Sequence, residues 1–443
     1  MRTSFVTPGR FLLDSFAAGR GHLLPAVAVT GVVGGLIGAA YVTALNLMRG
    51  VLFPEHWSRP AHWLVLIAVG ITIAVLIKLL GDPGDTELLV NNIHISGGPE
   101  GLRSLRSLIP VSLIGIAAGG GIGPEGPLTQ ISGTVGSWLG QRFQLDKTEL
   151  RTCTITGMAA GFTVLFASPL GGAVFALEIL HRKGLEYYEA LIPAVLGALA
   201  GYAVYVATTR LGLQPIWSFE EAPKALHLAD LGWSVACGFA GAAVAVLFTW
   251  LSLFFRAVFR PLPVWAKPVM AAVLLGGVAY VSPYALTFSE YQLASLVTMK
   301  SVAVTTLLLA VVGHLLSAPI TMAGTWKGGF IIPLFFIGYC LGRAATPFLP
   351  GANEIVLATA MMVACNVGVT KTPLASVLVV AGMSGLRLLP TMLIAAVVSL
   401  FLTSGVVLLE SQRRRESVKG EDVIAEGESP LDHPEEGALA PGA

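Results

Sequence analysis

Long apolar segments separated by short polar breaks restrict what this sequence can fold into. A helix needs about 20 apolar residues to cross a bilayer, and residues 23–53 and 62–80 are each long enough. Further apolar segments follow near residues 153–180, 189–208, 231–255, 268–286, 302–320, 331–348, 355–368, 373–385 and 389–409. Only 12% of the 443 residues are charged, whereas a soluble domain carries about 25%. The sequence therefore predicts an all-α integral membrane protein.

Charge and polarity divide the chain into parts. Arginines precede the first apolar segment, and the triplet 413–415 follows the last one. Because basic residues favour the cytoplasmic side, we expect both termini in the cytoplasm and the protein in the cell membrane. The final residues are acidic and rich in Gly and Pro, which is typical of disorder. The expected parts are an N-terminal segment (1–21), a first membrane half (22–208), a linker (209–228), a second membrane half (229–410) and a disordered tail (411–443).

Several classes of function find no support in the sequence. The net charge of +1 gives no reason to expect a nucleic-acid partner. The four cysteines lie far apart, without metal-ligand spacing, so we expect neither a metal nor a cofactor. An intramembrane hydrolase would need a nucleophile with a base, or a metal-binding pair. The sequence has no HExxH and no GxSxG, and we do not expect an enzyme.

The stretch GPEGP, from Gly123 to Pro127, places a glutamate inside a long apolar region. An ionisable side chain at membrane depth is a functional-site hypothesis by default. Glycines keep this backbone free of side-chain bulk, and Pro127 suits the first turn of a helix, where proline loses no hydrogen bond. We therefore predict a break in the membrane, with Glu125 at the start of a helix.

A second stretch repeats this pattern. Gly329 to Pro333 (GFIIP) has the same Gly-x-x-x-Pro frame as Gly123 to Pro127. About forty residues after each frame comes another proline-led apolar segment, at Ser168–Pro169 and at Thr372–Pro373. The matched spacing favours two related halves, and such interrupted segments are typical of transporters, whose broken helices end near the midplane.

Helix starts of this kind suit an anion, because their exposed amides carry partial positive charge. The sequence offers three: Ser96 to Pro99, the GPEGP stretch, and Gly329 to Pro333. Glu125 would occupy the site as a carboxylate and leave it when protonated, which makes it a gate that depends on pH, voltage and anion concentration. The predicted anion-binding residues are Ser96, Gly97, Gly98, Gly123, Gly126, Gly329, Phe330 and Ile331.

In this order, SGGPE, GPEGP and GGFIIP resemble the three anion-site motifs of the CLC family of chloride channels and chloride/proton exchangers. The resemblance covers roughly residues 20–410. It implies an inverted repeat of broken and re-entrant helices, and a homodimer with one chloride pathway in each subunit. By position, Ser96 resembles the serine that coordinates chloride, Glu125 the gating glutamate, and Phe330 and Ile331 the residues whose amides complete the site.

The sequence also departs from the family. Ile95 and Gly98 differ from the usual first motif, Pro124 replaces a basic residue, and Ile331 replaces a phenylalanine. The position that resembles the exchangers' inner proton-transfer glutamate is Ile179. The last helix lacks the family's inner tyrosine, since Tyr339 is the last tyrosine in the chain.

These departures leave the mechanism open. We expect transport of chloride or a similar small anion, either by a channel or weakly coupled transporter, or by an exchanger. In an exchanger, protons would pass by Glu178, His94 or a water chain. We expect Glu178 mainly to form a local ion pair, and His94 and His314 to pack against their neighbours. We expect Lys371 to bind unsatisfied backbone carbonyls, or an acid, near the break in the second half. A cation or organic-solute transporter with this architecture would need more carboxylates near the midplane.

Overall fold

The structure is a computed structural model, which describes residues 22–53, 58–182, 184–209, 219, 225–288, 290–299 and 301–412. Within these ranges every regular element is a helix, apart from an isolated β-bridge between Gly123 and Gly329. Among the described residues, six helices are long and apolar enough to cross a membrane. The predicted segment 1–21, most of the linker 209–228 and nearly all of the tail 411–443 lie outside the described residues.

The first half contains eight described α-helices. They are α2 (Leu23–Leu52), α3 (Arg59–Leu80), α4 (Thr86–Ile95), α5 (Leu105–Ala117), α6 (Glu125–Arg142), α7 (Lys147–Phe166), α8 (Pro169–Glu178) and α9 (Leu191–Thr209). The second half is built from α10 (Leu228–Phe259), α11 (Ala266–Val281), α12 (Glu290–Thr298), α13 (Val304–Ala323), α14 (Ile331–Ala345), α15 (Glu354–Thr370), α16 (Pro373–Ser384) and α17 (Leu389–Leu402). Short 3₁₀ turns span Tyr188–Ala190, Pro283–Ala285, Thr346–Phe348 and Leu386–Leu388.

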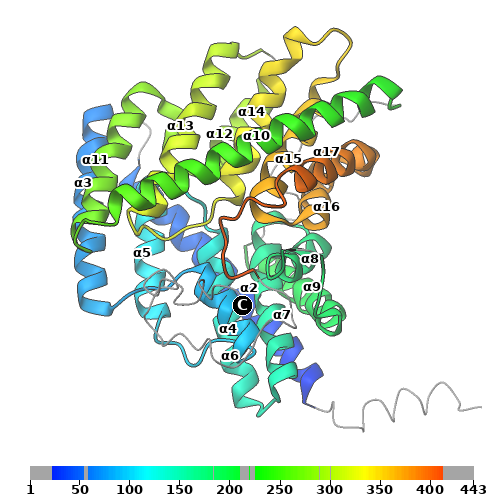
Figure 1. Ribbon diagram of the computed structural model, residues 1–443. Helices are drawn as coiled ribbons and strands as arrows, with labels where there is room; N and C mark the ends of the chain where they lie inside the picture. The colour runs from blue at the N-terminus through cyan, green and yellow to red at the C-terminus, as the bar shows by residue number, and fades with distance from the viewer. Residues whose placement is uncertain are drawn as a thin grey trace, which may run out of the picture.

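The two halves repeat one arrangement and pack against each other through corresponding helices. In the first half α6 packs on α7 and α2 on α9, and in the second α14 packs on α15 and α10 on α17. Between the halves, α3 contacts α11 and α8 contacts α16 (Figure 1). Contacts between equivalent elements are expected around a pseudo-twofold axis. The predicted all-α inverted repeat is confirmed.

Matching backbone turns create the broken helices. The residues that follow α7 and α15, Ala167 and Lys371, are both in the left-handed region, with φ of 51° and 61°. Pro169 and Pro373 then begin α8 and α16, as the paired proline-led segments predict. Lys371 binds carbonyls that are left free at helix ends. Its Nζ donates to Gly368 O at the end of α15 and to Thr403 O after α17.

The chain after α17 turns back into the protein (Figure 1). Leu408 and Leu409 are buried, and so are Ser411 and Gln412, which the sequence assigned to the tail. Gln412 Nε2 donates to Ile179 O at 3.0 Å and to Thr370 O at 2.8 Å. These contacts fix the end of the described chain between the two halves.

Candidate functional site

Glu125 begins α6 and reaches across to the second half of the chain. Its side chain is fully buried, with a relative exposure of 0%. Its Oε1 accepts a hydrogen bond at 3.1 Å from the backbone N–H of Ile332, in the first turn of α14. A carboxylate thus lies where the amides of a helix start attract negative charge.

A pair of backbone hydrogen bonds holds the two helix starts together. Gly123 N–H donates to Gly329 O, and Gly329 N–H donates to Gly123 O, both at 2.7 Å. A Cβ at Gly123 would lie 1.9 Å from Glu125 Oε2, and one at Gly329 would lie 2.4 Å from Glu125 Cγ. Neither position can hold a side chain while the carboxylate rests there. The structure therefore brings together GPEGP and GFIIP, which the sequence paired only by their frame.

The residues expected to complete the second helix start lie beside this pair. Phe330 precedes α14 and Ile331 is its first residue. The Phe330 ring packs against Phe248, with ring centroids 6.0 Å apart. Gly126 also lies at this junction, because a Cβ there would come within 3.1 Å of Gly328 C.

The first predicted motif is not a helix start. Ser96 is the residue after the last turn of α4, and its Oγ donates to the carbonyls of Asn92 or Gly98. The prediction is wrong because Ser-Gly also ends helices: Gly97 has φ of 92°, the left-handed conformation that commonly closes a helix.

The loop formed by Ser96, Gly97 and Gly98 packs far from Glu125. Pro99 O accepts a hydrogen bond from Ser137 Oγ at 2.7 Å. Ser137 lies twelve residues after Glu125 on α6, a helical distance of about 18 Å. The loop therefore presents helix-end carbonyls, not helix-start amides, and it does so at the other end of α6.

The helix start that the sequence interpretation missed is that of α4. Asp85 caps it by accepting a hydrogen bond from Leu88 N–H at 2.9 Å. Just before it, Asp82 Oδ1 accepts from Gly84 N–H at 2.8 Å, and Gly84 has φ of 67°. An aspartate followed by an apolar helix is an N-cap signal, and Asp85 carries this signal in the sequence.

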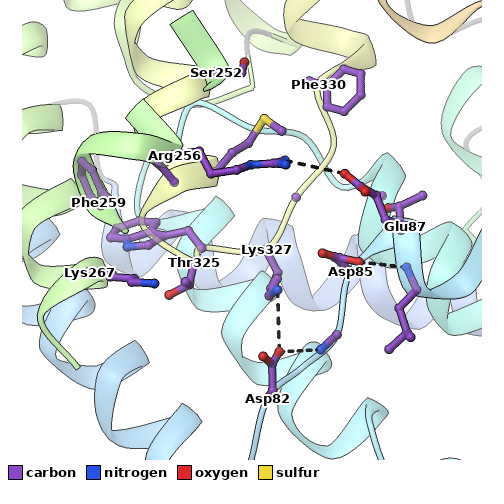
Figure 2. Close-up of a pocket in the computed structure, with 18 of the residues that line it drawn as sticks. Asp82, Asp85, Glu87, Ser252, Arg256, Phe259, Lys267, Thr325, Lys327 and Phe330 are labelled. Atoms are coloured by element: carbon purple, nitrogen blue, oxygen red, sulfur yellow. Dashed lines mark hydrogen bonds and ion pairs between the residues drawn. The ribbon is translucent and has the colours of Figure 1, made fainter. Parts of the chain in front are cut away.

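A cavity of about 600 Å³ joins the starts of α4, α6 and α14 (Figure 2). The residues that line it at these helix starts are Gly84 and Asp85 for α4, Gly126 and Pro127 for α6, and Gly328 and Phe330 for α14. Its wall also carries four basic side chains, Arg256, Arg260, Lys267 and Lys327. Three helix starts and four cations form an environment that favours an anion.

Acidic side chains balance part of this charge. Arg256 lies 3.6 Å from Glu87, and Lys327 lies 3.9 Å from Asp82, as the dashed lines in Figure 2 mark. Burial, and next the neighbouring Asp85 carboxylate, raise the pKa of Glu87 to about 7, although Arg256 acts in the opposite direction. Glu87 therefore changes charge close to neutral pH.

A second buried acid lies at another helix start. Glu178 is 3% exposed, and its carboxylate accepts from Leu374 N–H at 3.2 Å and from Ala375 N–H at 2.8 Å, in the first turn of α16. Glu178 thus binds backbone amides of α16, whereas the sequence led us to expect a local ion pair. Both Glu125 and Glu178 thus join a helix of the first half to the start of a helix in the second.

The histidines named from the sequence are buried. His94 Nε2 lies 2.9 Å from Leu180 O, and His94 Nδ1 lies 2.8 Å from Tyr187 Oη. Since a carbonyl only accepts, Nε2 carries the proton and Nδ1 accepts from the tyrosine hydroxyl. His314 packs edge-on against Phe336, with ring centroids 4.9 Å apart, in line with the packing role expected for it.

Known proteins share this sequence pattern and fold. The sequence model described as voltage gated chloride channel matches residues 92–404. A chloride/fluoride channel protein of Pseudomonas syringae pv. tomato is 27% identical over 416 residues, which cover 87% of this chain and 86% of the relative. An H(+)/Cl(-) exchange transporter, ClcA, of Klebsiella pneumoniae is 24% identical and is covered over 80% of its length, with 81% of this chain.

Solved structures extend the comparison to the fold. A CLC-type fluoride/proton antiporter superposes with a TM-score of 0.78 at 22% identity, covering 92% of this chain and all of that one. A slow cyanobacterial Cl-/H+ antiporter superposes with a TM-score of 0.75 at 20% identity, covering 87% of this chain and 94% of the other. At these identities the similarity establishes the fold alone.

Proposed function

The chain belongs to the voltage-gated chloride channel family, whose members are channels and transporters rather than enzymes, and we propose that it carries a halide through the cavity, with Glu125 as its gate. It is a multi-pass integral membrane protein that belongs among the anion transporters. The gate assignment rests on the hydrogen bond that the Glu125 carboxylate accepts from the backbone N–H of Ile332. An acid that occupies an anion's binding position competes with that anion.

The amides at the starts of α6 and α14 form the proposed binding position. We keep the anion-binding role that the sequence led us to expect for Gly123, Gly126, Gly329, Phe330 and Ile331. The start of α4, at Gly84 and Asp85, takes the place that Ser96, Gly97 and Gly98 were expected to fill, because it lines the same cavity. These neutral donors suit conduction, since an ion must be held weakly enough to leave.

The anion is chloride or fluoride. The Pseudomonas relative is named for both, and one structural neighbour is a fluoride/proton antiporter. Ile179 cannot carry a proton, which favours uncoupled conduction. Glu178, one residue earlier, is a buried acid and favours coupling. A homodimer in the cell membrane with both termini in the cytoplasm stays our prediction.

Vesicles containing the full chain test the proposal. A chloride-selective or fluoride-selective electrode records anion efflux, while a pH electrode records protons. We expect anion efflux that depends on pH, and we expect Glu125→Gln to remove most of this dependence. Glu100→Gln is the matched control, because Glu100 is exposed. Absence of anion efflux would refute transport, and efflux from Glu125→Gln with unchanged pH dependence would refute the gate.

A further inference from the structure

One face of α4 is buried and polar. Glu87, Asn91 and His94 are spaced by four and three residues and therefore lie on the same side of this helix. Their relative exposures are 7%, 1% and 2%. Buried polar groups cost free energy unless they are hydrogen-bonded. Three such groups on one side of a ten-residue helix form a buried polar face, here called the polar face of α4.

The polar face of α4 reaches the cavity at Glu87. The Glu87 side chain lines the cavity and faces Arg256 of α10, and it also accepts a hydrogen bond from the backbone N–H of Glu410. The Asp85 carboxylate is a further charge near it. Glu87 is thus in contact with the cavity and with the chain segment that follows α17.

The other end of the polar face lies at the end of α8. His94 binds Leu180 O, and Gln412 binds Ile179 O, the adjacent carbonyl. Other charged or titratable groups at this end are His181, Tyr187 and Arg151, whose guanidinium lies 4.5 Å from the Tyr187 ring centroid. His181 lies 3.8 Å from Glu186, which is partly exposed. The buried acid Glu178 is the last residue of α8.

Helix α4 and residues 410–412 therefore have contacts at the same two ends. Glu87 meets Glu410 at one end, and His94 and Gln412 meet consecutive carbonyls at the other. From Glu87 to His94 the helix covers about 10 Å. Residues 409–412 form a turn, in which Gln412 N–H donates to Leu409 O at 3.5 Å, and the Gln412 side chain extends from this turn to the end of α8.

Unsatisfied polar atoms lie between these contacts, both on α4 and in residues 410–412. Neither Asn91 Oδ1 nor Asn91 Nδ2 has a hydrogen-bond partner in the part of the chain that the structure describes, and the same holds for Ser411 Oγ. Ser411 is 4% exposed. Buried polar atoms of this kind are usually hydrogen-bonded by ordered water. An amide and a hydroxyl together offer such waters both donors and acceptors.

We propose that ordered water held by Asn91 and Ser411 forms a proton branch, which leaves the anion cavity at Glu87 and reaches the end of α8. The proposal rests on the transport function above and makes the protein a proton-coupled exchanger despite Ile179. Glu87 gives its proton to the first water and is reprotonated from the cavity, so no group is consumed. Anions and protons share the cavity and separate at Glu87.

The test is made on the full chain in vesicles, with anion and proton fluxes recorded together. Asn91→Leu removes the amide at similar volume, and we expect it to lower proton flux about tenfold while anion flux persists. Asn91→Ser, which can still hold water, should retain most of the proton flux. Asn92→Leu is the matched control, because the neighbouring asparagine points away from this face and is only half-buried.

The outcomes separate this inference from the proposed function. Anion flux without any proton flux in the unmodified protein would overturn the branch and leave transport standing. An unchanged proton-to-anion ratio in Asn91→Leu would overturn it as well. If Asn91→Leu does not fold, Ser411→Ala takes its place, with the same loss of proton flux expected and the same unchanged ratio counting against the branch. Absence of anion flux in every variant would refute transport itself.

Discussion

The Glu125 carboxylate accepts a hydrogen bond from the backbone N–H of Ile332, at 3.1 Å and across 207 residues of sequence. Helix α6 of the first half thereby supplies the negative charge at the start of α14 in the second half. The paired hydrogen bonds between Gly123 and Gly329 fix the distance between these helix starts. The position of one side chain therefore decides whether the amide meets a carboxylate or another anion.

Glu125→Ala should leave the Ile332 amide open to an anion. Made in a Glu87→Gln background, so that neither Glu125 nor Glu87 can titrate, the variant should show anion efflux that varies by less than about twofold between pH 5 and pH 8. Efflux from vesicles, normalised to protein content, measures this. A variant that keeps the pH profile of the unmodified protein would show that the gate lies elsewhere.

Gly329→Ala should displace the gate without removing it. The new Cβ would come 2.4 Å from Glu125 Cγ, and overpacking of this kind costs about 1–3 kcal/mol. We expect a lower melting temperature and efflux that responds weakly to pH. In the double variant Gly329→Ala/Glu125→Ala, the clash is removed and the melting temperature should recover. No recovery would indicate that the alanine disturbs the bridge to Gly123 instead.

Ser96→Ala should leave the chloride-to-fluoride preference unchanged, because the hydroxyl binds helix-end carbonyls away from the cavity. Gly84→Ala provides the comparison. Gly84 lines the cavity, its φ is 67°, and a Cβ there would lie 3.3 Å from Gln130 Nε2. We expect slower efflux from this variant, measured with each halide. A changed preference in Ser96→Ala would return Ser96 to the site.

Glu87 should make the stability of the folded protein depend on pH. Burial raises its pKa from 4.5 to about 7, so between these values the folded protein keeps a proton that the unfolded chain releases. Stability therefore falls as pH rises through this window, by up to roughly 3 kcal/mol. We therefore compare the melting temperatures of Glu87→Gln and the unmodified protein. The difference, variant minus unmodified, should be larger at pH 8 than at pH 5. An equal difference at both pH values would contradict this.

The sequence by itself determined the class of protein and several helix starts. Hydropathy and low charge require a membrane protein, because few charged groups are available for a water-facing surface. Prolines at 169 and 373 mark helix beginnings, since proline loses no hydrogen bond at the first helical position. Glu125 was identifiable because a carboxylate in an apolar region demands a partner.

Only the tertiary structure decided which helix ends meet. Serine, glycine and proline stand at both ends of helices, so Ser96 could be read as a start although it closes α4. The partners of Glu125 and Glu178 are backbone amides in the other half, and an amide leaves no signature in the sequence. The convergence of α4, α6 and α14 on one cavity follows from packing between the halves, which local patterns do not encode.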